Sequence, residues 1–96
     1  MKVIFKKEND KKHKYKAIFY DDNNNKIKTV KFGGYGYWDF TIHKDDIRKQ
    51  RYLNRHKKPE NWNNYMSAGA LSRWLLWNKP TLKESLEDFK NKFNLN

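Results

Sequence analysis

The positive charge of this chain is unevenly distributed, and its distribution limits which segments can build a core. Residues 1–31 carry ten Lys against four acidic residues, and residues 44–58 carry seven Lys and Arg against two. Residues 59–96 carry five against four and are rich in Leu and Trp. A basic N-terminal two-thirds joined to a balanced, apolar C-terminal third suggests one face for a polyanion and one packed base. Nucleic acid is the obvious polyanion.

Length and composition set further bounds. Ninety-six residues suffice for one domain with a single modest core. Because 36% of the residues are hydrophobic and 17% are aromatic, that core must be built largely from Trp, Tyr and Phe. The absence of Cys excludes a disulfide framework and a thiolate metal site. No apolar run approaches the length of a membrane span or a signal peptide, so we expect an unsecreted protein that does not enter a membrane.

The N-terminal segment has little to bury. Residues 3–5 are apolar enough for a short strand, whereas residues 6–14 are highly charged and predict a loop or mobile arm. We therefore expect residues 1–13 to be a basic N-terminal segment and residues 14–96 to form a single domain.

Two alternating segments follow and predict a β-hairpin. Residues 15–20 and 26–32 have the period of strands, and the Asp/Asn-rich residues 21–25 between them tolerate positive φ. One face of the first strand is apolar, while the other should present a ladder of Lys side chains with apolar stems. Residues 33–38, with three Gly among them, then predict a flexible aromatic loop.

Helical signals dominate the second half. Residues 45–57 begin with acids and end with bases, as a helix dipole favours, and their apolar stripe of Ile47, Tyr52 and Leu53 is narrow. Ser67 is a suitable N-cap for a helix that ends at Asn78 before a proline. In the same way, Thr81 and Glu84 form a capping box that opens an amphipathic final helix with Leu82, Leu86, Phe89 and Phe93 on one side. The expected fold is α+β, a β-hairpin or small antiparallel sheet packed against two or three helices.

Three strings of the sequence resemble a known protein family. They are FGGYGYWDFTIHKD at 32–45, RYLNRHKK at 51–58 with ENW at 60–62, and SAGALSRWLLWNKPTL at 67–82. Together they resemble an uncharacterised family of small basic proteins encoded by giant nucleocytoplasmic large DNA viruses, over about residues 13–95. The resemblance implies a viral protein in the virion or in a viral factory of the host cytoplasm. It supplies no catalytic residue, cofactor or ligand.

The basic helix has the chemistry of a polyanion site. Arg48, Arg51 and Arg55 are spaced to share one helix face, and the planar fork of arginine suits phosphate oxygens and the guanine edge. A solvated helix is the alternative interpretation. Aromatic residues of the glycine-rich loop can stack on bases or enter a minor groove, although core packing is at least as plausible for Trp38 and Phe40. The candidate nucleic-acid-binding residues are Lys14, Lys16, Lys26, Lys28, Lys31, Tyr35, Tyr37, Lys44, Arg48, Lys49, Arg51, Arg55, Lys57 and Lys58.

Other function classes have weaker support. The acidic and His residues considered for a metal-dependent nuclease are Asp39, His43, Asp45, Asp46, His56 and Glu60. They lack the spacing of a metal motif, and no P-loop or nucleophile elbow is present, so we expect neither an enzyme nor a metal or cofactor. A small capsid or core protein that binds acidic viral proteins is an alternative, since charge alone does not separate it from a DNA-binding protein. Trp62, Trp74 and Trp77 could suggest a ligand site, but Trp74 shares a helix face with Leu71 and is assigned to the core, and the C-terminal third as a whole is assigned to stability.

The sequence therefore predicts a protein that binds double-stranded DNA with little sequence preference, in genome condensation, packaging or organisation. Other virion proteins are further candidate partners, and a small domain with many aromatic residues can form a homodimer. The prediction depends on the hairpin lysines and the helix arginines lying on a common side of the molecule.

Overall fold

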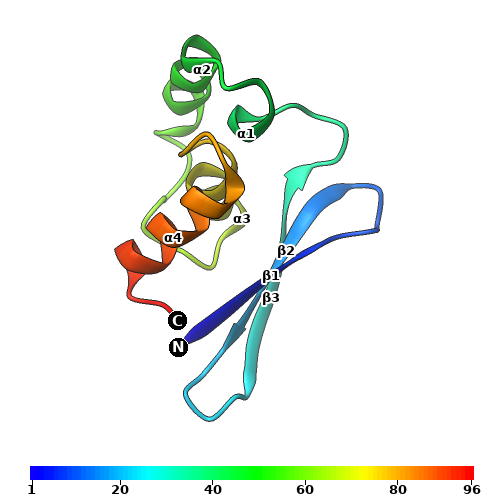
Figure 1. Ribbon diagram of the computed structural model, residues 1–96, viewed down its shortest axis with the longest axis vertical. Helices are drawn as coiled ribbons and strands as arrows, with labels where there is room; N and C mark the ends of the chain where they lie inside the picture. Colours follow the sequence, from blue (N-terminus) through cyan, green and yellow to red (C-terminus); the bar gives the residue numbers. More distant parts are fainter.

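A three-stranded antiparallel sheet forms one layer of the molecule, and helices cover one of its faces (Figure 1). The computed structural model describes residues 1–96. The strands lie in the order β1 (Lys2–Lys7), β2 (His13–Tyr20) and β3 (Lys26–Gly34). The helices are α1 (Phe40–His43), α2 (Asp46–His56), α3 (Ala68–Leu71), the π-helical turn η1 (Ser72–Leu76) and α4 (Leu82–Phe93). This arrangement confirms the predicted α+β class.

The N-terminal segment belongs to the sheet. β1 pairs with β2 along its whole length, and Val3, which lies opposite Phe19, is buried. The prediction that residues 6–14 form a loop or mobile arm is wrong, because only residues 8–12 lie outside the strands. β1 pairs with β2 not only through its apolar residues 3–5 but also through Lys6 and Lys7. In the turn that follows, the Asp10 carboxylate accepts a hydrogen bond from the Lys12 backbone N–H.

The predicted hairpin is confirmed as β2 and β3. Asp21 holds its turn, because the Asp21 carboxylate accepts hydrogen bonds of 2.9 Å from the backbone N–H groups of Asn23 and Asn25. Asn24 has a φ of 63°, a conformation that Asn tolerates better than most residues. The register shifts by a bulge between Phe19 and Tyr20.

The core lies between the sheet and the helices. Its buried residues are Val3, Ala17, Phe19, Val30, Phe32, Leu71, Leu75, Leu76, Phe89 and Leu95. The strand register places the five buried sheet residues on the same face of the sheet. α3, η1 and α4 therefore cover that face and leave the other face open. Burying each Val, Leu or Phe stabilises the fold by about 1.5–3 kcal/mol. Trp74 and Trp77 pack at the margin of this cluster, as half-buried rather than fully buried side chains.

Local capping signals place the helices well. Asp45, Ser67 and Thr81 each accept a hydrogen bond from a backbone N–H in the first turn of α2, α3 and α4. Only half of the predicted capping box forms, because Glu84 accepts from the Thr81 hydroxyl instead of the Thr81 backbone N–H. The helix predicted to reach Asn78 ends at Leu76, after a π-helical turn. None of the helices has the length and apolar character needed to cross a membrane.

Candidate functional site

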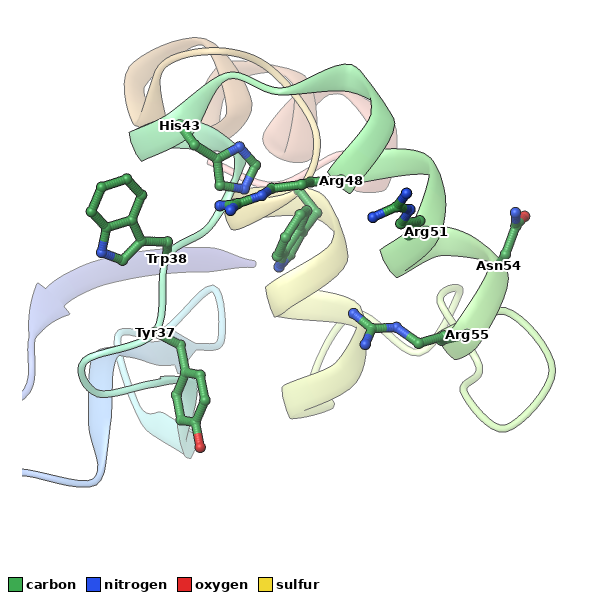
Figure 2. Close-up of a pocket in the computed structure, with 8 residues that line it drawn as sticks. Tyr37, Trp38, His43, Arg48, Arg51, Asn54 and Arg55 are labelled. Atoms are coloured by element: carbon green, nitrogen blue, oxygen red, sulfur yellow. The ribbon is translucent and has the colours of Figure 1, made fainter.

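An open cleft of about 690 Å³ lies between α2 and the loop that follows β3 (Figure 2). Figure 2 shows the side chains of α2 on one side and those of the loop on the other, with α1 between them. The lining residues are Tyr37, Trp38, His43, Arg48, Arg51, Asn54, Arg55 and Trp77. Three arginines thus meet three large aromatic rings around one hollow.

The inward face of α2 determines where its arginines point. Tyr52 is buried and stacks on Trp77, with the ring centroids 4.3 Å apart and the planes inclined by 4°. It also stacks on His56 at 4.2 Å. Lys49 lies on this same inward side, where its Nζ donates a 2.7 Å hydrogen bond to the Asn78 carbonyl. Tyr52 and Lys49 thus occupy the inward face of α2. The arginines, which are spaced to share another face of the helix, therefore lie on the side that lines the cleft.

The arginines of the cleft are almost free of internal partners. Arg48 makes one ion pair with Asp45, and it is long at 3.9 Å. Arg51 and Arg55 make none. All three are exposed, so they can contact an external anion without first breaking a contact within the protein.

The aromatic wall is a loop held at both ends. Its start is fixed because the Tyr35 N–H donates to the Lys12 carbonyl at 3.0 Å. A tight turn follows, in which the Tyr37 N–H donates to the Gly34 carbonyl and Gly36 adopts a φ of 84°. Trp38 is 65% exposed and Tyr37 is 76% exposed. Of the two interpretations left open for Trp38, core packing is therefore contradicted.

The far end of the loop is anchored by a buried ion pair. Asp39 caps α1 and also accepts a 2.6 Å hydrogen bond from Lys14 Nζ, and both side chains are largely buried. Phe40 is buried beside it, as the core interpretation predicted. Lys14, a candidate for the binding surface, is thus used inside the protein.

His43 lies between the two walls of the cleft. Its Nδ1 accepts a 2.9 Å hydrogen bond from the Asp45 backbone N–H, so a neutral ring carries its proton on Nε2. Nε2 is buried and has no hydrogen-bond partner in the protein. The ring packs against Trp77, with centroids 5.4 Å apart.

The acidic and His residues considered for a metal site are used separately. Asp39 binds Lys14 and the start of α1, whereas the carboxylate of Glu60 accepts hydrogen bonds from His56 and from the Trp62 indole, each at 2.9 Å. No group of three or more His, Asp or Glu side chains is placed to hold a metal ion.

The sheet lysines lie away from the cleft. Lys16 pairs with Lys6 and Lys31 in a row across the face opposite the helices, and Lys26 lies on this open face too, which confirms a lysine ladder there. Lys28 falls on the other face, opposite Phe19. The prediction that the sheet lysines and the helix arginines share one side is wrong, because the sheet register turns the ladder away from the helical layer.

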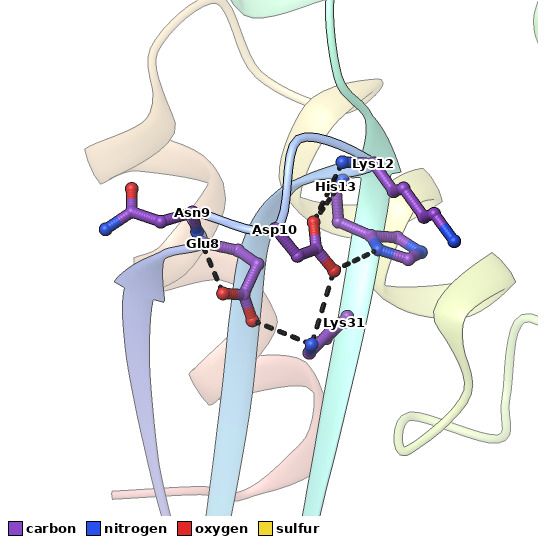
Figure 3. Close-up of polar contacts among 6 residues, drawn as sticks. All are labelled: Glu8, Asn9, Asp10, Lys12, His13 and Lys31. Carbon is purple, nitrogen blue, oxygen red and sulfur yellow. Dashed lines mark hydrogen bonds and ion pairs between the residues drawn. The ribbon is translucent and has the colours of Figure 1, made fainter.

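The ladder is partly neutralised by carboxylates (Figure 3). Lys31 Nζ lies 3.2 Å from Asp10 and 3.5 Å from Glu8. The hydrogen bond with Asp10, together with the charge of Glu8, raises the pKa of Lys31. Hydrogen bonds from the His13 side chain and from backbone N–H groups hold the pKa of Asp10 far below its usual range.

The remaining cations near α2 lie outside the cleft lining. Lys44, Lys57 and Lys58 are exposed, and Lys44 closes α1 in a left-handed conformation with φ 53°. Lys49 is turned inward, and burial lowers its pKa. Tyr35 lines a second hollow of about 420 Å³ on the other side of the loop.

Four cleft residues were absent from the predicted set: Trp38, His43, Asn54 and Trp77. Asn54 was within reach of sequence reasoning, because it lies three residues after Arg51 on the same helix face. The glycines around Trp38 were a signal for an exposed ring. His43 and Trp77 reach the cleft through tertiary packing and have no such local signal.

Neither the curated proteins nor the solved structures include a significant match to the chain. A match does exist at the level of a protein family, over residues 3–56. That range is more than half of the chain and contains the sheet, the aromatic loop and the arginines of α2. The chain belongs to the family described as a family of unknown function, DUF5754.

Proposed function

We propose that this protein binds nucleic acid through the arginine face of α2, largely without reading sequence. The observation that supports this most is the convergence of Arg48, Arg51 and Arg55 on an open cleft, with Arg51 and Arg55 free of ion pairs. Unpaired guanidinium groups bind phosphate oxygens in a two-pronged geometry. A net charge of +11 adds long-range attraction for a polyanion.

Sequence independence follows from the kind of contact. Guanidinium groups that bind phosphates position a nucleic acid but carry no information about its bases. Such binding releases counterions, so a footprint of about six phosphates loses on the order of a thousandfold in affinity between about 50 and 200 mM salt.

Duplex DNA is the partner that we propose from the sequence, with a role in genome condensation, packaging or organisation. From the resemblance to proteins of large DNA viruses we propose that the protein acts in the virion or in a viral factory of the host cytoplasm. Cations on the open sheet face and on α2 point in different directions, and this geometry would let one molecule contact two segments of DNA, as condensation requires.

A pair of charge-matched variants tests the binding surface. Arg51→Gln with Arg55→Gln removes two charges from the cleft, and Lys16→Gln with Lys26→Gln removes two from the open sheet face. We expect the arginine pair to weaken binding of a labelled duplex and to lower the salt slope by about two phosphate contacts. The lysine pair should retain most of the affinity for a short duplex but compact long DNA less in light scattering.

The measurement is fluorescence anisotropy across a salt series, with heparin as competitor and far-UV circular dichroism as the check on folding. Equal losses from both variant pairs would mean attraction by overall charge alone. An absence of binding to any nucleic acid would favour the alternative, a structural protein that binds acidic proteins.

A further inference from the structure

We infer that the cleft binds an unstacked base together with its phosphate, so that single-stranded nucleic acid is the preferred ligand. This inference rests on the proposed binding of nucleic acid by the arginine face, and it replaces the duplex, which was proposed from the sequence, with a single strand as the ligand of the cleft. It depends on the wall of the cleft opposite the arginines, where Tyr37 and Trp38 are more exposed than any other large aromatic residues of the chain.

Trp38 differs from the other three tryptophans in having no partner. Trp77 stacks on Tyr52, Trp74 packs against Phe93 and lies under Arg73, and Trp62 also lies under that guanidinium. No aromatic ring or cation of the protein covers either face of Trp38. An exposed indole face next to unpaired arginines is suited to stacking on the flat ring of a base.

The two walls match the two parts of a nucleotide. A nucleotide joins a flat base to an anionic phosphate, and the cleft joins the Trp38 ring to the guanidinium groups of Arg48 and Arg55, which point toward the loop in Figure 2. Its volume of about 690 Å³ lies within the range of roughly 300–1,000 Å³ typical of small-molecule sites. Asn54 adds a side-chain amide that can donate to or accept from a base edge.

Only an unpaired strand offers both parts at once. In a duplex the base faces are covered by neighbouring bases, so a duplex can satisfy the arginines but must unstack before it reaches Trp38. A single strand presents base faces at no such cost, and stacking on aromatic side chains tolerates every base. The aromatic wall therefore adds affinity for single strands and little for duplexes.

The loop that carries Tyr37 and Trp38 is already ordered in the free protein. On one side of the exposed rings the Tyr35 N–H donates to the Lys12 carbonyl, and on the other side the Asp39 carbonyl accepts from α1 while its carboxylate binds Lys14. The Tyr37 ring lies directly over Gly34, where a Cβ would lie 2.6 Å from Tyr37 Cδ2. Because the rings are positioned by the loop itself, less ordering entropy is lost on binding.

The test compares ligands with the same phosphates but different bases. The probes are labelled oligothymidine of about 12 nucleotides, an abasic strand of equal length, oligouridine and the matching duplex, all followed by anisotropy. We expect oligothymidine to bind more tightly than the abasic strand and the duplex. Oligouridine has the same phosphates and a uracil base, which lacks only the methyl group of thymine, so its comparison with oligothymidine tests whether RNA can also supply the strand.

Two loop variants make the test specific. Tyr37→Ala with Trp38→Ala should lower oligothymidine affinity by between about fivefold and a hundredfold and leave the abasic strand unchanged. Tyr35→Ala is the matched control, because Tyr35 is an exposed ring of the same loop that lines only the second hollow, whereas Tyr37 and Trp38 line both hollows. It should change neither affinity.

The outcomes separate the two proposals. Equal affinities for oligothymidine and the abasic strand, or equal losses for both in the Tyr37/Trp38 variant, would overturn base stacking and leave phosphate binding by the arginines intact. If no strand and no duplex binds, the proposed function fails as well. A loss for oligothymidine or oligouridine that is confined to the Tyr37/Trp38 variant supports the inference.

Discussion

Gly33 stands where β3 leaves the sheet, and two separate features exclude a side chain there. Its φ is 78°, a conformation that residues with a Cβ rarely adopt. A Cβ at this position would also lie 2.7 Å from Leu76 Cδ1. Because Leu76 is buried in the core, it has little room to move away.

We expect Gly33→Ala to lower the free energy of unfolding by more than Gly36→Ala does. Gly36 has a similar φ of 84°, but nothing lies within 4 Å of its Cβ position. Gly36→Ala therefore measures the cost of the left-handed conformation alone, about 1–2 kcal/mol, whereas Gly33→Ala adds the clash with Leu76. Urea unfolding of both variants gives the difference. Equal losses would show that Leu76 moves aside at no cost.

Individual cations were the least predictable part of the site. Arg51 and Arg55 lie exposed on one helix face, as their spacing predicted. Lys14, Lys31 and Lys49 were assigned to the same surface, but each is bound to a group 21 to 29 residues away in sequence. Charge counting treats every lysine as free, and only the tertiary structure shows which ones are paired.

At the level of elements, the turn between β1 and β2 depends on one carboxylate. Asp10 accepts 2.9 Å hydrogen bonds from the backbone N–H groups of Lys12 and His13 (Figure 3). It also contacts the His13 ring at 3.0 Å and Lys31 at 3.2 Å. A single side chain thus joins the turn to β3, the strand on the other side of β2 from β1.

This turn should make the stability of the protein depend on pH in the acid range. The pKa of Asp10 is depressed in the folded protein, first by the hydrogen bond from the His13 side chain. Its stabilising effect is therefore complete above the unfolded pKa of about 3.9 and is lost as pH falls toward the folded value. Asp10→Asn should lower stability at neutral pH, and its difference from the wild type should shrink below about pH 4.

Urea midpoints at neutral and acid pH test this prediction. Glu87→Gln is the control, because Glu87 is an exposed residue of α4 that makes no ion pair. A difference between Asp10→Asn and the wild type that stays constant through the acid range would contradict the role of the Asp10 charge.

Elements with local signals were predicted well. The hairpin followed from alternation and from an Asp/Asn-rich turn, and α2 and α4 followed from Asp45 and Thr81 as caps. η1 was missed. There the Trp77 N–H bonds to the Ser72 carbonyl, five residues back, and Arg73 donates to the Trp77 carbonyl. These contacts form only when the helix packs on the core, so no local sequence pattern predicts them.

At the scale of the whole molecule, one core joins the sheet to the helices. Phe89 of α4 is fully buried, and its ring contacts Phe5 of β1 and Phe93 at centroid distances of 5.9 and 5.2 Å. The first strand and the last helix are thereby packed into one cluster. Sheet and helices should consequently unfold as one unit.

Phe89→Ala is expected to lower the free energy of unfolding by about 3–5 kcal/mol, since it leaves a cavity in this cluster. Phe89→Leu keeps most of the volume and should lose less. Far-UV circular dichroism and tryptophan fluorescence should give coincident unfolding curves for every variant that folds. Two separate transitions would show that the sheet and the helices are independent folding units.

The ends of the chain meet beside β1. The Val3 N–H donates to the Asn96 carbonyl at 3.1 Å, and the Asn96 N–H donates to the Met1 carbonyl at 3.0 Å. Figure 1 shows both ends together and away from α2. A peptide linker of a few residues would suffice to cyclise the backbone, and anchoring the protein to a sensor surface through either end would leave the arginine cleft facing the solution.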